Sequence, residues 1–379
     1  MKKILSKVNK GGNRKILIAL SAICVILIIY FFSKSRKASA EPLRSFSGNE
    51  GYELNDSHFH LTNYIQKGTD IHQFLSIMGT KVGRTAIFGI PLQQQWSYRV
   101  DGKNAPKYYL DSDAPLYYYS FTDAHIAMAY KSLSAEQQQR LDPMITGFNP
   151  TDLYAADHIR RVLRTFPGVF SGIREFTIHK EFVSPKIAGG VASISDPALD
   201  SILSLAGKIG LVVLMHNDID KPFPKAGTAN YLSDLKALFK RHPKTTIIWA
   251  HIGLGRVVHP VKDQVALVEE IVKDPSLNHV HFDISWDEVA KYMLASDTAL
   301  TLSAGLLNRY PDRFLFGTDV VAPTDQETYL KVYYQYDPLW KLLSSETSEK
   351  IRKFNYIRIF DEARRKVRKW EKLQGPAAN

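Results

Sequence analysis

The stretch Asn55-Asp56-Ser57-His58-Phe59-His60 closes a run that begins at Glu53 and has the length of a β-strand. A period of two along a strand places His58 and His60 on the same face, so that both imidazoles can reach one point. Further short β-branched or aliphatic runs follow, each bounded by turn residues. They cover residues 85–90, 144–148, 170–179, 211–216, 246–251, 280–285 and 314–319.

Eight strands separated by helical patterns predict an α/β protein of the (β/α)8 type, a TIM barrel. The interval over residues 91–143 is the long one and contains a tyrosine cluster, so we expect an insertion there that covers the carboxyl-terminal mouth of the barrel. A doubly wound sheet is the alternative that periodicity leaves open. Such a sheet would not gather residues from the first and eighth strands at one centre.

Three later strands also end in residues that bind metals. His216 and His251 each close an apolar run, and Asp319 closes the last one. The carboxyl ends of barrel strands face the active site, so histidine or aspartate at these positions indicates function. Two histidines in one strand are weak evidence alone. Their recurrence from strand to strand predicts a metal site.

Composition excludes several classes of protein. The 379 residues are 45% hydrophobic and 23% charged, which is typical of a globular chain. The net charge of +11 arises mainly in residues 1–40, which hold nine Lys or Arg and no acid, so 40 bases face 38 acids in the remainder. We therefore expect no nucleic-acid partner. The single cysteine, Cys24, excludes a disulfide scaffold and cysteine-ligated zinc.

The N-terminal segment predicts a membrane anchor. Residues 16–32 carry no charge, and six positive residues precede them while three follow. This asymmetry predicts a single-pass transmembrane helix, with residues 1–15 in the cytoplasm, residues 33–51 as a linker and the barrel outside the cytoplasm. The alternative is a signal peptide and export after cleavage near Ala40.

The chain resembles the amidohydrolase superfamily, in its amidohydrolase-related branch. The His-x-His motif of the first strand, single histidines ending the fifth and sixth strands, and an aspartate ending the eighth carry the resemblance. Three details add to it: Ile252-Gly253 after the second single histidine, Gly317-Thr318 before the aspartate, and residues 353–360, which resemble the helix that closes this barrel. The resemblance implies a barrel domain over residues 52–365 and a C-terminal tail over residues 366–379.

The resemblance also implies roles for the residues at the strand ends. His58 and His60 would bind the deeper ion, with Asp319 as a further ligand. His216 and His251 would bind a second ion, or in a one-metal enzyme would shape the pocket and polarise the substrate carbonyl. Asp319 would accept the proton of the attacking water, so Asp319 and His251 are the predicted catalytic residues. The expected cofactor is one or two divalent ions, with zinc preferred over manganese or iron.

On the fourth strand, Glu175 is the predicted bridging ligand. It shares strand parity with His179, whereas Lys180 is expected to point to the opposite face. The alternative is a salt bridge from Glu175 to Arg174 or to a nearby lysine.

Two further residues are predicted to contact substrate: Arg256, which could hold a substrate carboxylate, and Asp283 at the end of the seventh strand. The alternative for Arg256 is a pair with a carboxylate on a helix. The tyrosine cluster lines a pocket or packs as a lid (Tyr108, Tyr109, Tyr117, Tyr118 and Tyr119). The sequence thus predicts a metal-dependent hydrolase that cleaves an amide, ester, lactone or related bond of a small molecule. The alternatives are a metal-dependent non-oxidative decarboxylase and a non-catalytic barrel that acts as a binding protein.

Overall fold

A computed structural model describes residues 51–223 and 228–374. The predicted segments 1–15, 16–32 and most of the linker 33–51 lie outside the described residues. Within the described part, no helix has the length and apolar character needed to cross a membrane.

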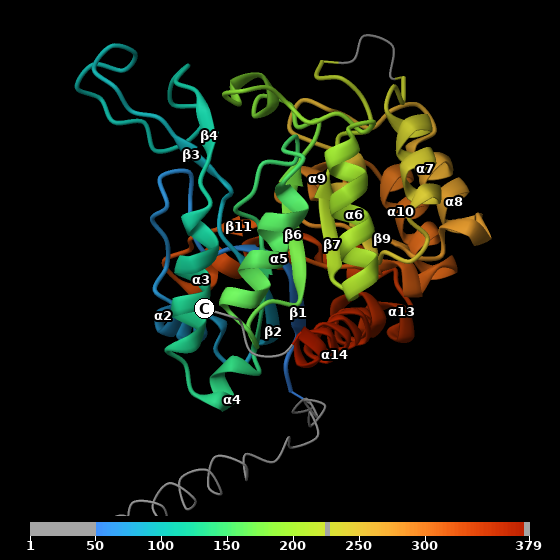
Figure 1. Cartoon of the computed structure of the whole chain (residues 1–379). Coiled ribbons are helices and arrows are strands. Elements are labelled where there is room, and N and C mark those ends of the chain that lie inside the picture. The colour runs from blue at the N-terminus through green and yellow to red at the C-terminus, as the bar shows by residue number, and fades with distance from the viewer. Residues whose placement is uncertain (1–50, 224–227, 375–379) are drawn as a thin grey trace, which may run out of the picture. The chain divides into compact units, whose positions relative to one another are not determined.

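Strands and helices alternate along the chain (Figure 1). The strands are β1 (Leu54–His60), β2 (Val82–Phe88), β3 (Leu92–Gln94), β4 (Leu116–Tyr118), β5 (Leu141–Ile145), β6 (Gly172–Thr177), β7 (Val212–His216), β8 (Ile247–Trp249), β9 (Val280–Asp283), β10 (Phe314–Leu315) and β11 (Val320–Val321). The helices are α2 (Ile71–Met78), α3 (Phe121–Lys131), α4 (Ala135–Gln138), α5 (Ala155–Thr165), α6 (Pro197–Ile209), α7 (Leu232–Arg241), α8 (Gln264–Lys273), α9 (Asp287–Met293), α10 (Asp297–Arg309), α11 (Gln326–Gln335), α12 (Asp337–Trp340), α13 (Ser345–Glu349) and α14 (Asn355–Gln374).

Nine strands form one parallel sheet in the order β10-β9-β8-β7-β6-β5-β2-β1-β11. Its two edge strands belong to one short segment, residues 314–321: β10 pairs with β9, and β11 pairs with β1. Between them, the backbone N–H of Ser57 donates to Phe316 and that of Asp319 donates to His58. The sheet is therefore curled, and the segment predicted as the last strand joins both of its edges. Asp319, which precedes β11, has a positive φ (55°), so the chain is not a continuous strand between β10 and β11.

The helices pack their apolar faces on the outside of the sheet. In α6, Leu199, Ile202, Leu203 and Ile209 are buried at the spacing of one helix face. Pro197 begins this helix, and Gly210 ends it in the left-handed conformation (φ 91°). The chain then enters β7 directly, so the connection is short.

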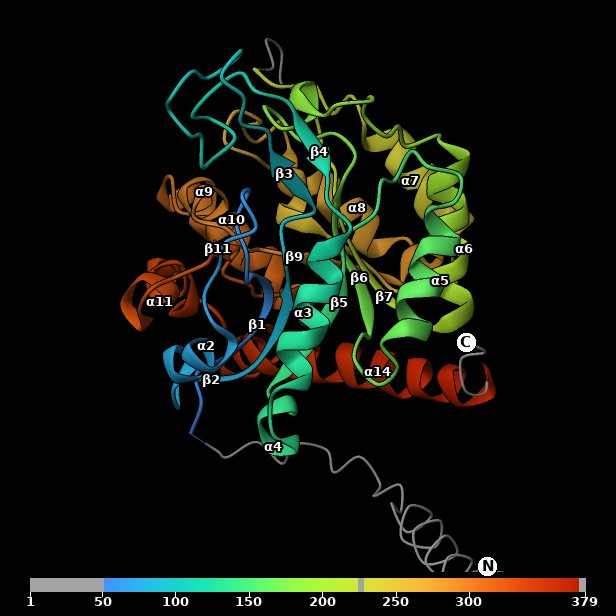
Figure 2. The same ribbon diagram turned by 60° about the vertical axis from the view of Figure 1, so that its left-hand side comes forward.

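Toward the amino ends of the strands, the interior of the curled sheet holds an apolar cluster and the buried guanidinium of Arg174, which lies over the rings of Phe88 and Phe360. Ala86, Phe88 and Met144 pack there against Tyr356 and Phe360 of α14. Figures 1 and 2 show α14 across this end and the β3–β4 hairpin at the opposite end. The predicted tail boundary at residue 366 is wrong, because α14 continues to Gln374 and buries Val367.

The predicted insertion over residues 91–143 is only partly correct. The antiparallel pair β3–β4 is an addition at the carboxyl end of the sheet. The helix α3 that follows is instead the ordinary crossover between β2 and β5, which are neighbours in the sheet. Pro143 suggested a boundary, but it lies inside β5, opposite Ile87.

Candidate metal centre

Four predicted ligands meet at the carboxyl end of the sheet. His58 and His60 come from β1, Glu175 comes from β6, and Asp319 lies between β10 and β11. Nε2 of His60 is 3.1 Å from both Glu175 Oε2 and Asp319 Oδ1, and Nε2 of His58 is 3.1 Å from Asp319 Oδ1. One ligand atom from each of the four residues lies within 4.8 Å of the others. We call these four residues the deep set.

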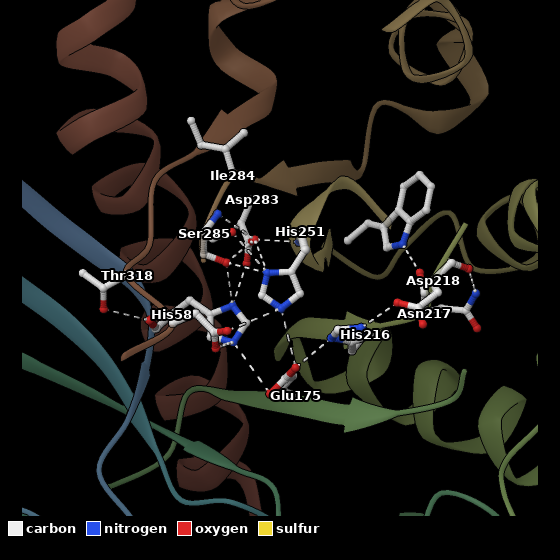
Figure 3. A network of polar contacts seen from close by, with 12 residues as sticks. His58, Glu175, His216, Asn217, Asp218, His251, Asp283, Ile284, Ser285 and Thr318 are labelled. Carbon is white, nitrogen blue, oxygen red and sulfur yellow. Dashed lines mark hydrogen bonds and ion pairs between the residues drawn. The ribbon is translucent and has the colours of Figure 1, made fainter. Parts of the chain in front are cut away.

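A second set shares Glu175 and adds the two single histidines. Oε1 of Glu175 is 2.9 Å from Nδ1 of His216 and 3.7 Å from Nε2 of His251. These three ligand atoms also lie within 4.8 Å of one another. Figure 3 shows His58, His216 and His251 pointing toward Glu175. The residues predicted from five separate strands are therefore neighbours, with Glu175 between the two sets.

Three of the histidines, His58, His216 and His251, have a polar neighbour at the ring nitrogen that points away from the centre. Nδ1 of His58 lies 2.8 Å from Asp283 Oδ2, and Nδ1 of His251 lies 3.0 Å from Ser285 Oγ. Nε2 of His216 lies 3.0 Å from Asp218 Oδ1. When these nitrogens carry the proton, the other nitrogen of each ring presents its lone pair to the centre.

The backbone at the centre adopts conformations that side chains rarely take. His251 has φ of 57°, Asp319 has φ of 55° and Trp286 has φ of 82°. Non-glycine residues in the left-handed region cost free energy and cluster at functional sites. Each follows the end of a strand, so these turns bring the side chains back over the mouth of the sheet.

Asp56 and Gly317 hold the first and last strands together beside the deep set. The Asp56 carboxylate accepts from the backbone N–H groups of His58 and Thr318 and from the Thr318 hydroxyl. A Cβ atom at Gly317 would lie 2.6 Å from the Cβ atom of His58. The close approach of these strands therefore requires glycine at position 317.

The chemistry of the donor set fits a divalent cation. Among the described residues, Nε2 of His58 and Nε2 of His251 have no hydrogen-bond partner, although both are buried and face carboxylate oxygens. Burial alone would raise the pKa of Glu175, but Lys180 and the neighbouring histidines hold it well below its usual range. Burial likewise opposes the charge on Asp319, yet His58 and His251 lower its pKa. Imidazole and carboxylate ligands of this kind suit zinc, manganese or iron.

The prediction that Lys180 points away from Glu175 is wrong. Its Nζ lies 2.9 Å from Glu175 Oε1, because β6 ends at Thr177 and the chain turns back before Lys180. His179, which shares the parity of Glu175, instead stacks on the ring of Tyr231. A register shift within β6 also breaks the simple alternation.

The two predicted substrate contacts occupy different places. Asp283 is fully buried, and its oxygens lie near His58 Nδ1 and accept from the backbone N–H of His251 and the Ser285 hydroxyl. In this position Asp283 can orient His58 and His251. It does not have the exposed position that a substrate contact requires, so the expected contact is not found. Arg256 lies at the mouth, where Nη1 donates to the hydroxyls of Tyr108 and Tyr109. Its Nε lies 3.4 Å from Glu288 Oε1 in α9, so the expected alternative, a pair with a helix carboxylate, is present.

The tyrosines of the β3–β4 addition pack close to this arginine. Tyr109 is buried against Tyr64, and Nζ of Lys186 donates to the backbone oxygens of Tyr109 and Ser112. Burial raises the pKa of Tyr109, so its hydroxyl is neutral. The guanidinium of Arg256 also lies 5.7 Å from the ring of Trp286. Aromatic side chains and one arginine therefore line the mouth.

Sequence reasoning missed Asp218, Asp56 and the inward position of Lys180. Asp218 and Asp56 each lie two residues from a predicted ligand, His216 and His58, at a spacing that allows a short turn back to the ring or backbone. This His-x-Asp or Asp-x-His spacing is the signal that could have found them. The position of Lys180 depends on a turn that strand parity does not describe.

A curled parallel sheet with helices outside it, and with histidine and carboxylate ligands at the carboxyl ends of its strands, defines the class of metal-dependent α/β enzymes. The model of the family described as Amidohydrolase matches residues 56–361, most of the chain. The protein belongs to the amidohydrolase family and is a metal-dependent, amidohydrolase-like enzyme.

Solved structures share this fold at low sequence identity. An amidohydrolase from Burkholderia multivorans with bound zinc is 12% identical, with a TM-score of 0.50 over 81% of this chain and 99% of that one. A protein from Agrobacterium tumefaciens, also 12% identical, has a TM-score of 0.50 over 83% of this chain and 96% of that one. Comparison with curated protein sequences gives no significant match.

Proposed function

We propose that this enzyme hydrolyses an amide, ester, lactone or related bond of a small molecule, with a divalent ion, zinc in the first instance, held by the deep set at the mouth of a (β/α)8 barrel. The observation that carries the proposal is the meeting of His58, His60, Glu175 and Asp319 within 4.8 Å. A bound divalent ion supplies Lewis acidity and makes water nucleophilic at neutral pH.

Asp319 is the proposed general base. Its Oδ1 faces His58 and His60, while Oδ2 lies 3.9 Å from Nε2 of His251. Its side chain is 11% exposed, against 2% for Glu175. Because its pKa is lowered, Asp319 is ionised at neutral pH and can accept the proton of the attacking water at Oδ2.

His251 is the proposed second catalytic residue. Ser285 holds its Nδ1, and its Nε2 faces Asp319 across the space where a reacting carbonyl would lie. When Nε2 carries a hydrogen, it donates a hydrogen bond to the carbonyl oxygen as negative charge develops there. Asp283 fixes the backbone at this point by accepting from the N–H of His251.

The mouth favours a small anionic substrate. Arg256 places Nη1 beside the hydroxyls of Tyr108 and Tyr109 and pairs through Nε with Glu288 at 3.4 Å. A guanidinium binds a carboxylate through two parallel hydrogen bonds, so a substrate carboxylate would be bound through Nη2 and the second N–H of Nη1. The aromatic rings supply an apolar wall for a planar group. We propose that Arg256 holds a substrate carboxylate while the scissile bond lies over the deep set.

The charge pattern of residues 1–40 supports a location outside the cytoplasm. We propose that residues 16–32 tether the enzyme to the membrane, or that the enzyme is released after cleavage near Ala40. Fractionation of cells that express the full chain tests this: retention in the membrane fraction supports the tether, and a shortened soluble product supports cleavage.

The reaction is tested by metal analysis combined with turnover in water labelled with oxygen-18. The probes are γ-lactones, aryl esters and N-acylated amino acids that carry a free carboxylate. We expect bound divalent metal and label in the product carboxyl group. His60→Ala should lose both, whereas the exposed His72→Ala should keep both.

Other outcomes would contradict hydrolysis in distinct ways. Release of carbon dioxide from carboxylate-bearing probes without incorporated label would identify a decarboxylase. Purified protein that holds no metal, binds the probes and does not convert them would identify a binding protein on the same fold.

A further inference from the structure

Lys180 places its ammonium group inside the candidate metal centre. The loop after β6 is held by Ser184, whose hydroxyl accepts from the backbone N–H of Lys180 at 2.8 Å and donates to the carbonyl of Ile178. The Lys180 side chain is 11% exposed, and Nζ lies 2.9 Å from Oε1 of Glu175. Lysine is rarely buried to this extent without a negatively charged partner, so the contact with Glu175 is the reason for its position.

The two oxygens of Glu175 have different surroundings. Oε2 faces the deep set, 3.1 Å from Nε2 of His60. Oε1 faces the second set, 2.9 Å from Nδ1 of His216, and is also the oxygen that Lys180 contacts. A second divalent ion would need Oε1 as a ligand at about 2.0–2.2 Å, because this oxygen is the carboxylate atom of the second set.

We propose that the Lys180 ammonium takes the place of a second metal ion, so that the centre binds one divalent ion, in the deep set. This inference rests on the proposed function. Two cations on one buried carboxylate oxygen repel each other strongly, because the surrounding protein screens them poorly. Lys180 thereby neutralises Oε1, and His216 stays a pocket residue held between Glu175 and Asp218.

Metal stoichiometry of single variants tests the proposal directly. The full chain is purified, equilibrated with excess Zn²⁺, freed of unbound metal and analysed by mass spectrometry of the elements. We expect about one ion per chain for the wild type and a rise toward about two for Lys180→Met, which keeps length but removes charge. Lys180→Arg keeps the charge and should stay near one.

A matched control shows whether the effect comes from the charge beside Glu175 Oε1 or from the loss of any positive charge, and a second measurement detects the second ion independently. Lys67 is exposed on the loop after β1, and Lys67→Met should leave the stoichiometry at the wild-type value. Proteins loaded with Mn²⁺ give a second readout, since two ions that share Glu175 couple magnetically and broaden the electron paramagnetic resonance spectrum. We expect a coupled signal in Lys180→Met alone.

Three results bear on the proposal differently. Two ions in the wild type would overturn the role of Lys180 and leave the proposed hydrolase intact. A single ion in folded Lys180→Met, with folding checked by circular dichroism, would also overturn it. Wild-type protein without any bound divalent ion would refute the proposed function itself.

Discussion

The two ends of the curled sheet use buried charge in opposite ways. At the amino end, Asp142 contacts Arg84 at 2.8 Å, accepts from Arg364 and accepts from the Tyr356 hydroxyl at 2.7 Å. At the carboxyl end, carboxylates and histidine nitrogens face one another across the deep set.

The buried charges at the amino end stabilise the fold, whereas those at the carboxyl end are arranged to bind a ligand. The charges of the amino end balance one another and are covered by α14, so they tie β2, β5 and the last helix together. At the carboxyl end, acceptor atoms converge and the backbone is strained, which is costly unless a cation binds. The following changes should therefore affect metal binding at one end and folding stability at the other.

The largest effect on function is expected from His58→Ala. It removes a ligand of the deep set, so the variant should lose bound metal and at least about a thousandfold in kcat/KM, since a bound metal supplies several kcal/mol of transition-state stabilisation. Metal analysis and initial rates measure both. His72→Ala is the control. Unchanged metal content in His58→Ala would show that His58 is not a metal ligand.

The largest effect on stability is expected from Asp142→Ala at the amino end. It leaves the buried guanidinium of Arg84 without its main partner, which should lower the free energy of unfolding by about 3–5 kcal/mol. Denaturant titration measures the loss. Folded variant protein should still bind metal, and a parallel loss of metal affinity would show that the two ends are not independent.

A smaller effect on function is expected from Asp283→Asn. This change weakens the hold on Nδ1 of His58 and should reduce metal affinity about 10–100-fold, as loss of such supporting partners does. Competition with a chelator measures the affinity. If Asp283 contacts substrate instead, the variant would keep its metal affinity and show a raised KM.

The last effect concerns the pH dependence of stability. Burial raises the pKa of Asp123 to about 7 from 3.8, while its oxygens accept from the N–H groups of Thr146 and Gly147. The folded state therefore binds the proton more tightly than the unfolded state, and stability should fall as pH rises from about 4 to 7 by on the order of 1 kcal/mol per pH unit. Asp123→Asn should flatten this slope in denaturant titrations at several pH values. Equal slopes in both proteins would contradict the shift.

The fold and the meeting of the predicted ligands could be read from the sequence because both depend on local patterns. Apolar runs define strands, and polar residues at their ends mark the carboxyl edge of a parallel sheet, so the sequence predicts that His216 and His251 lie near His58, as they do in the structure. Glu175, predicted from the fourth strand, also lies at the centre next to His216, although His179, which shares its strand parity, does not. Whether these residues bind metal stays a prediction.

The features that could not be predicted from the sequence depend on turns and on departures from regular strand alternation. Lys180 reaches Glu175 through a turn that begins after Thr177, where alternation no longer applies. The position of Asp283 at the end of the seventh strand predicts a side chain that faces the mouth, but the contact with His58 Nδ1 keeps it buried. The extent of α14 was missed because its apolar spacing continues past residue 365 among many charged residues.

The segment 314–321 links closure of the sheet to completion of the deep set. It contributes Asp319 and at the same time bonds to β1 and β9, which lie far apart along the polypeptide. A nascent chain that has not yet emerged past this point has neither a finished enclosure nor a full set of ligands. Fragments that end before residue 314 should therefore lack both the closed sheet and the fourth member of the deep set, and we expect them to be inactive.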